Sequence, residues 1–314
     1  MRRGPLSDPA FKGQFSGHET FPLRLLWLRK AYDAVCQYQD GAPRSLFADP
    51  ESIIRFGVGR NMVTAIRHWA LACDVICEQE STYRPTALGD FLFGKEVGRD
   101  PFIEQAATSW LIHWMIAGHA VRTTTWYWAF NYLSSQSFDR ESLAKPIFAF
   151  CKERKRERTT ATTIKRDVEC FVRSYVPRTA GKFSDDMMEP LLAELGLIRP
   201  AGPKTFAFRR GPKPGLPDGV FHFALLHFWK GFAPESRTLA VEAVAFEPGS
   251  PGRVFKLDEH SLVERLSRIE EASGGAFIWT DTAGVRNVSC HSLDIDPFTL
   301  LDAAYNDRSR RRAA

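Results

Sequence analysis

The most regular hydrophobic pattern in the chain lies between Met62 and Cys73. Apolar residues recur there at intervals of three and four, which predicts an amphipathic helix. Gly57 and Gly59 precede it and predict a tight turn, and Asn61 stands near the expected N-cap. The polar face of this helix is expected to carry Arg60, Asn61, Thr64, Arg67 and His68. The stretch is typical of the turn and second helix of a helix-turn-helix, whose polar side chains reach bases and phosphates. An ordinary helix with a solvated basic face is the alternative.

The flanking pattern extends this motif to a winged helix. Pro22 suits the first turn of a preceding helix, and Thr20 is a candidate for its cap. The expected elements are a helix over residues 22–36, a short helix over 50–56, the central helix, strands over 75–80 and 82–84, and a helix that begins at Pro85. Helix, helix, helix and hairpin is the order of a winged helix, which we predict for residues 15–100. Residues 1–14 are predicted to be a flexible lead-in.

Residues 101–210 are predicted to hold a second helical region. Residues 101–133 are rich in aromatic residues at helical spacing, which predicts a buried helix pair broken near residues 122–125. Stacking of these rings on unpaired bases is the alternative. Further helices are expected over residues 143–151, 164–175 and 183–196, with strands near 205–208. This order favours a second winged-helix-like unit, although no sequence repeat supports a duplication.

The last part, residues 211–314, is predicted to mix helices and strands. It begins with a loop rich in glycine and proline over residues 211–219. The expected elements are helices over 220–229, 261–272 and 297–305 and strands over 276–280 and 285–290. The whole chain is therefore predicted to be mainly α with small β hairpins, in the α+β class.

Composition narrows the class of partner. Of 314 residues, 44% are hydrophobic, which excludes general disorder, and the formal net charge is +5. Between Lys145 and Lys182 there are eleven Lys and Arg against four Asp and Glu, and the tail after Asp307 is also basic. Such concentration favours a polyanionic partner. No apolar run reaches the length of a membrane span and no signal peptide is evident, so we expect a soluble cytoplasmic protein.

The cysteines and short motifs do not point to a standard enzyme. The six cysteines form no Cys-x-x-Cys pair and are expected to be reduced. Phosphate-binding glycine loops, Gly-x-Ser-x-Gly and His-Glu-x-x-His motifs are missing from the sequence. His113 and His119 lie among apolar residues and are expected to be core residues.

The most unusual polar cluster is Ser16-Gly-His-Glu-Thr-Phe21 with Arg24. It brings an imidazole, a carboxylate and a guanidinium to an expected loop-to-helix junction, where a helix N-terminus favours anions. His18 is the candidate acid or base, with Glu19 and Arg24 as its catalytic companions. Two alternatives remain open. The cluster contacts an anion or DNA without catalysis, or Glu19 and Thr20 cap the helix while His18 and Arg24 pair with neighbours.

The candidate DNA contacts share a positive or polar side chain on a predicted helix face or in the basic segment. They are Arg60, Asn61, Thr64, Arg67, Lys152, Arg154, Lys155, Arg156, Lys165, Arg166 and Arg173. For the segment from Lys152 to Arg158, an ordinary solvated face is the alternative.

Several of these stretches together resemble a known family. They are Phe15-Ser-Gly-His-Glu-Thr-Phe-Pro-Leu-Arg24 with Trp27-Leu28, Phe56-Gly-Val-Gly-Arg-Asn-Met-Val63 with Ile66-Arg-His-Trp69, Pro85-Thr-Ala-Leu-Gly89, and Thr163-Ile-Lys-Arg-Asp-Val168. They are similar to the SspB-like family, an uncharacterised-domain family encoded beside sulphur-transfer genes in bacterial DNA phosphorothioation loci. The resemblance extends from about Phe15 to the last helix.

The resemblance implies a role in replacing a non-bridging phosphate oxygen of DNA by sulphur, as part of phage defence. Family members are understood to nick one DNA strand. The implied partners are DNA, a cysteine desulfurase, an ATP-using sulphur-transfer enzyme of the PAPS-reductase type and a further ATPase. A divalent metal such as Mg²⁺ would accompany nuclease activity. A non-catalytic adaptor for the sulphur-transfer enzymes and a winged-helix transcriptional regulator are the alternatives.

Overall fold

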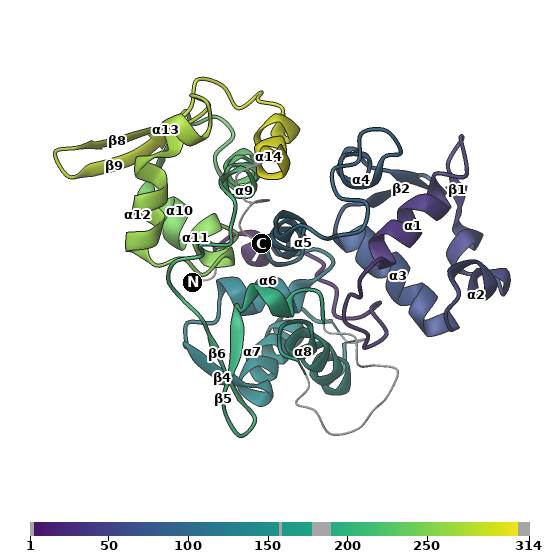
Figure 1. Ribbon diagram of the computed structural model, residues 1–314. Coiled ribbons are helices and arrows are strands. Elements are labelled where there is room, and N and C mark those ends of the chain that lie inside the picture. Colours follow the sequence, from purple (N-terminus) through teal and green to yellow (C-terminus); the bar gives the residue numbers. More distant parts are fainter. Residues whose placement is uncertain (1–2, 157–158, 178–189, 307–314) are drawn as a thin grey trace.

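The computed structural model describes residues 3–156, 159–177 and 190–306, and its helices and small sheets form the predicted α+β mixture. Three units repeat one topology: a helix, a short strand, two or more helices and an antiparallel hairpin. In each unit the short first strand pairs with the last strand of the hairpin, which gives the sheet orders β1-β3-β2, β4-β6-β5 and β7-β9-β8. The units lie side by side around the helices α5 and α6, with the first and third at opposite ends (Figure 1).

The first unit has the predicted helix–helix–helix–hairpin order. Its elements are α1 (Trp27–Val35), β1 (Ala42–Pro43), the 3-10 turn η2 (Arg44–Phe47), α2 (Glu51–Phe56), α3 (Arg60–Ala72), β2 (Ile76–Gln79) and β3 (Thr82–Pro85), followed by α4 (Ala87–Phe93). Gly57 ends α2 in the left-handed conformation at φ 65°, where a Cβ would be unfavourable. Gly59, rather than Asn61, is the residue that precedes α3.

The predicted start of the first helix is wrong. Residues 21–26 are not helical, and α1 begins only at Trp27. Thr20 has a φ of 64°, which is incompatible with the extended backbone of a helix cap. The indole Nε1 of Trp69 also donates a hydrogen bond to the carbonyl oxygen of Phe21 at 3.0 Å, so the tertiary structure uses this backbone group elsewhere.

The second unit is built on the aromatic helix pair. Its elements are α6 (Thr124–Asn131), β4 (Ser137–Asp139), α7 (Arg140–Glu153), α8 (Ala161–Tyr175), the 3-10 turn η3 (Ala193–Leu195), β5 (Ile198–Gly202) and β6 (Thr205–Phe208). Asp139 and Ser142 form a capping box at the start of α7, and the Thr160 hydroxyl caps α8. Most of the helix expected over residues 183–196 lies outside the described residues.

Burial confirms that the aromatic residues belong to the core. Helix α5 (Ala106–Gly118) and helix α6 carry six such side chains, each at most 6% exposed: Trp110, Trp114, Trp126, Tyr127, Trp128 and Phe130. His113 is buried as predicted, and its two ring nitrogens contact the Tyr175 hydroxyl and the Val254 carbonyl. These rings therefore pack inside the protein and are not available to stack on bases.

The third unit was not recognisable from the sequence as a copy of the other two. Its elements are α9 (Asp218–Phe232), β7 (Thr238–Ala240), α10 (Val241–Phe246), α11 (Pro251–Val254), α12 (Glu259–Ser267), α13 (Ile269–Ala272), β8 (Ile278–Thr282) and β9 (Val285–Ser289). The last helix, α14 (Pro297–Asn306), packs against α9. Helices as short as α10 and α11 contain fewer than two turns, so hydrophobic periodicity does not reveal them.

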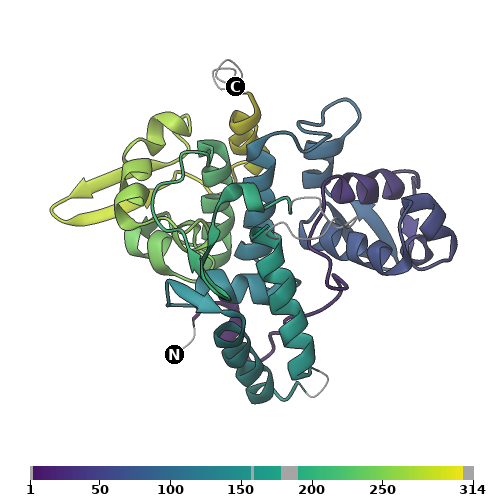
Figure 2. The same cartoon turned by 60° about the horizontal axis from the view of Figure 1, so that its bottom comes forward.

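The N-terminal segment is packed, which contradicts the predicted flexible lead-in. Leu6, in the short 3-10 turn η1 (Pro5–Ser7), is completely buried, and Phe15 is also buried. In Figures 1 and 2 the segment runs from the second unit, beside α7 and α8, across to the first unit. Two anchoring side chains in a polar stretch are too few to produce a periodic signal. In the part of the chain that the structure describes, no helix has the length and apolar character needed to cross a bilayer.

Candidate nucleic-acid interface and the buried His18 cluster

Helix α3 presents its first turn to solvent. Arg60 and Asn61 are exposed, and the Arg60 guanidinium donates a hydrogen bond to the Ala48 carbonyl at 3.3 Å. Thr64 and Arg67 are half-buried, and Arg67 donates to the Tyr83 hydroxyl at 3.2 Å. The polar side chains of α3 that reach solvent therefore lie between Arg60 and Arg67.

The rest of α3 faces the protein. His68, which the sequence assigned to the polar face, is only 4% exposed, so that assignment is wrong. The helix packs against its own unit, against the N-terminal segment through His68, and against Trp126 of the second unit through Trp69. A helix with two packed sides buries residues on both sides of its apolar stripe.

Helix α8 carries the corresponding cations of the second unit. Lys165 and Arg166 are exposed in its first two turns. Arg173 lies further along the same helix and donates to the Thr20 carbonyl at 3.3 Å. Because α8 precedes the hairpin of its unit as α3 precedes that of the first unit, the two cationic faces occupy equivalent topological positions.

The basic segment from Lys152 to Arg156, at the end of α7, contains two kinds of cation: some face solvent and others contact the N-terminal segment. Lys152 and Lys155 are exposed. Arg154 donates to the Leu6 and Ser7 carbonyls at 2.9 and 3.1 Å, and Arg156 donates to the Gly13 carbonyl. Alternation of direction along a turn is not visible in a charge run, which is why all four were predicted to contact phosphate.

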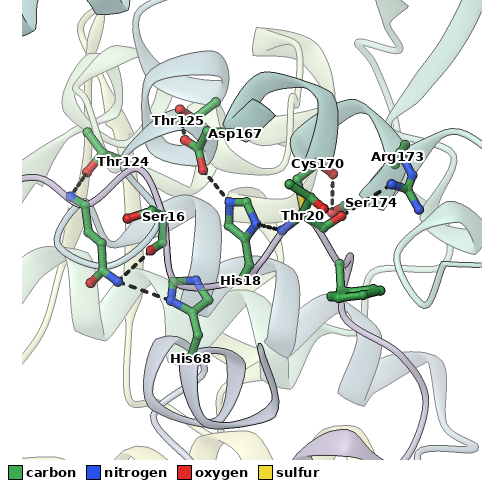
Figure 3. Close-up of polar contacts among 12 residues, drawn as sticks. Ser16, His18, Thr20, His68, Thr124, Thr125, Asp167, Cys170, Arg173 and Ser174 are labelled. Carbon is green, nitrogen blue, oxygen red and sulfur yellow. Dashed lines mark hydrogen bonds and ion pairs between the residues drawn. The ribbon is translucent and has the colours of Figure 1, made fainter. Parts of the chain in front are cut away.

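His18 lies inside the protein, between the first and second units. It is 3% exposed, and its Nε2 lies 2.5 Å from the Asp167 Oδ1 of α8. The Thr20 backbone N–H donates to Nδ1 at 3.0 Å, and the Thr125 hydroxyl donates to the other oxygen of Asp167 (Figure 3). The imidazole is also stacked on Trp69, with ring centroids 6.1 Å apart. Both ring nitrogens are thus engaged by protein groups.

These contacts determine which ring nitrogen of His18 carries a proton. Burial lowers the pKa of the imidazole, while the neighbouring Cys170 sulphur and the Asp167 carboxylate raise it, and the balance is upward. Nδ1 accepts the Thr20 N–H, which requires an unprotonated nitrogen and therefore opposes the rise. The geometry favours the tautomer with its proton on Nε2, donated to Asp167.

We call residues 13–21 the strap. Gln14 ties its start to both units, because its backbone N–H donates to Thr124 Oγ1 at 2.8 Å and its side-chain Nε2 lies 3.3 Å from His68 Nδ1. Burial lowers the pKa of His68 well below its usual value, so this ring is neutral and can accept the amide proton. Gly17 has a φ of 111°, and a Cβ there would lie 2.7 Å from His68 Nδ1. The close approach requires glycine.

The structure separates the three predicted catalytic groups. His18 points inward to Asp167, whereas Glu19 is exposed and Arg24 lies over the rings of Phe21 and Trp27 at 5.6 and 5.5 Å. Glu19 has a φ of 47° and is followed by Thr20, which is also left-handed. Two consecutive left-handed residues without glycine are strained, and such strain is held only where surrounding contacts determine the backbone.

The position of Asp167 in its helix indicates that its carboxylate is buried. It lies on the apolar stripe of its helix, three residues after Ile164 and four before Phe171, where a solvated carboxylate would not be expected. A charge on a buried stripe needs a buried partner. The partner, His18, is 149 residues away, so no local pattern identifies it.

The side chains bear on whether the protein could hold a magnesium ion. Within the described ranges, no three His, Cys, Asp or Glu side chains come together in a group that could hold a metal ion. The buried His18–Asp167 pair is enclosed by aromatic rings and offers one imidazole and one carboxylate. These residues do not form a metal cage.

Comparisons with known proteins agree with the architecture. The family model described as "Protein of unknown function (DUF4007)" matches residues 15–305. A magnesium ion-bound SspB crystal structure is similar over 100% of this chain and 92% of that chain, with 26% sequence identity and a TM-score of 0.82. A second SspB crystal structure covers 99% and 92%, with 26% identity and a TM-score of 0.80. Among curated proteins, none matches the sequence.

Proposed function

Because the chain belongs to the DUF4007 family, we propose that it is a cytoplasmic DNA-binding protein of a phosphorothioate modification system and that it nicks one strand to permit sulphur incorporation. The structural similarity to SspB along the full chain supports this assignment. The observation that carries DNA binding is the pair of exposed cationic faces on α3 and α8, at equivalent positions in two adjacent units.

The proposed interface is smaller than the set of cations in the sequence. Its members are Arg60, Asn61, Thr64, Arg67, Lys152, Lys155, Lys165 and Arg166. Arg154, Arg156 and Arg173 are left out because they bind carbonyl groups of the N-terminal segment. Contacts of this type bind phosphate oxygens and fix the register on the duplex, while Asn61 at the helix start is suited to a base edge.

Nicking requires a base to activate water and a cation to stabilise the charge on the phosphorus oxygens. Of the predicted catalytic groups, Glu19 has the exposure that a base needs, and Arg24 is a half-buried cation over the rings of Phe21 and Trp27. His18 is buried and accepts the Thr20 backbone N–H, so it acts on the backbone that presents Glu19. The described residues contain no group of three His, Cys, Asp or Glu side chains that could hold Mg²⁺.

The proposed partners are a cysteine desulfurase, a PAPS-reductase-like sulphur-transfer enzyme and an ATPase of the same system. A non-catalytic adaptor that brings these enzymes to DNA is the second candidate. It is favoured by the burial of His18, the residue that the sequence offered as acid or base.

Supercoiled plasmid separates the two candidates. The full chain is incubated with plasmid in buffers with and without Mg²⁺, and relaxed circles are measured on a gel. We expect relaxation that is lost in Glu19→Gln and kept in Glu264→Gln, a control carboxylate on α12 of the third unit. Plasmid binding without relaxation in both buffers would contradict nicking and support the adaptor.

A further inference from the structure

The strap is the principal polar connection between the first and second units. Toward α3 it contacts His68 through Gln14 and receives the Trp69 indole N–H at the Phe21 carbonyl. Toward the second unit it bonds Thr124 of α6 through the Gln14 backbone and Asp167 of α8 through His18. A single segment of nine residues thus holds two units whose faces carry the candidate DNA contacts.

Among the described residues, the two units also meet through a pair of aromatic rings and lie near an exposed ion pair. Trp69 of α3 and Trp126 of α6 meet edge to face, with ring centroids 5.4 Å apart. Arg122 and Glu78 form an ion pair at 3.0 Å, and both side chains are one-third exposed. An exposed pair contributes little. Ring contacts of this kind resist separation but allow sliding, because dispersion has no direction.

The hydrogen bond between His18 and Asp167 is directional, so it can hold the strap in one orientation against α8. Both side chains are nearly completely buried, and Asp167 is also held by the Thr125 hydroxyl. The partners of His18 on its two nitrogens, Asp167 and the Thr20 N–H, fix the plane of the ring. Arg173 adds a bond from α8 to the Thr20 carbonyl. A charge-assisted hydrogen bond in a dry site has one geometry.

We propose that His18 and Asp167 are positioning residues that fix the first unit against the second, so that the cations of α3 and α8 engage one duplex together. The inference rests on the proposed DNA-binding function. Neither residue touches DNA. Their effect is avidity: two binding faces at a fixed separation bind a duplex more tightly than two faces that move independently.

The fixed arrangement of the first and second units is tested by the distribution of distances between two spin labels in the full chain. One label replaces Ile54 on α2, which is 86% exposed, and the other replaces Lys145 on α7, in a background with Cys36→Ser and Cys77→Ser. We expect one narrow distribution for the parent and for Asp167→Asn, which keeps the hydrogen bond. Asp167→Ala should broaden it. An unchanged, narrow distribution in Asp167→Ala would overturn the proposal.

Two further variants distinguish displacement of the strap from general destabilisation of the fold. Gly17→Ala leaves the buried charge in place but puts a methyl against His68, so it should displace the strap and broaden the distribution. Asp218→Asn, which weakens the Arg265 pair in the third unit, is the matched control and should leave the distribution narrow. If both broaden it equally, general loosening is responsible and the proposal fails.

A second experiment measures the affinity of the same variants for a 30-base-pair duplex at several salt concentrations. We expect Asp167→Ala to lose about 100-fold in affinity, the lower end of the gain from linking two binding faces, and Asp167→Asn to lose much less. A parent protein that binds no duplex would overturn the proposed function and the shared-duplex part of this inference. The distance distributions would still decide whether the strap fixes the two units.

Discussion

His18 and Asp167 are 149 positions apart in the sequence, yet their side chains meet at 2.5 Å in the interior. One comes from the N-terminal strap and the other from α8 of the second unit. The most distinctive polar motif of the sequence is therefore one half of a long-range contact. Its other half is the only acid on the buried side of α8.

Removal of one member of this pair should strongly destabilise the fold. Asp167→Ala leaves the His18 Nε2–H and the Thr125 hydroxyl without their acceptor, and each buried donor left unpaired costs about 1–3 kcal/mol. Asp167→Asn keeps an acceptor and should cost clearly less. Urea unfolding followed by circular dichroism measures the free energy of unfolding. Equal losses for the two variants would show that the carboxylate oxygen is not what the strap needs.

The packed N-terminal segment predicts a second effect on stability. Leu6 is completely buried under the basic segment, so Leu6→Ala should cost about 2–5 kcal/mol. Leu25→Ala, at an exposed leucine, is the control and should change the free energy of unfolding by less than about 0.5 kcal/mol. A Leu6→Ala protein as stable as its parent would restore the flexible lead-in that the sequence predicted.

Buried histidines predict acid lability. Burial lowers the pKa of His113 to about 3 and of His222 to about 4, and it lowers the pKa of His68 as well. Below pH 6.5 the unfolded chain binds protons that the folded protein excludes. The stabilisation is therefore complete above pH 6.5 and is lost as the pH falls, by about 1.4 kcal/mol per pH unit for each histidine.

The free energy of unfolding between pH 6.5 and 4.5 measures this slope. His222→Phe should reduce it by about 1.4 kcal/mol per pH unit. His260→Gln, at an exposed position on α12, is the matched control and should leave it unchanged. An identical slope in both variants would contradict the assignment of His222 as a buried neutral ring.

Local patterns predicted those parts of the fold that depend on local physics. The stripe from Met62 to Cys73, the aromatic helix pair and the first hairpin all appear, because periodicity and turn residues report on nearby backbone. The start of the first helix failed for a tertiary reason. Trp69 binds the Phe21 carbonyl, and the strap holds Thr20 in a conformation that cannot cap.

The candidate site was also predicted only where it depends on local sequence. The polar cluster from Ser16 to Phe21 stood out in the sequence, and it forms most of the strap between the first and second units. The sequence could not reveal that His18 faces inward, because Asp167 and Thr125 come from distant helices. It also could not separate Lys152 from Arg154, since only the fold decides which cations bind carbonyl groups of the N-terminal segment.

DNA binding by the faces of α3 and α8 is the central claim, and the salt dependence of duplex binding tests it most directly. Each phosphate contact contributes about 0.9 to the slope of log affinity against log salt. Arg60→Ala/Arg67→Ala and Lys165→Ala/Arg166→Ala should each lower that slope by about two units. Arg268→Ala/Arg286→Ala, at cations paired with acids in the third unit, should leave it unchanged. Unchanged slopes in both of the first two variants would contradict the account.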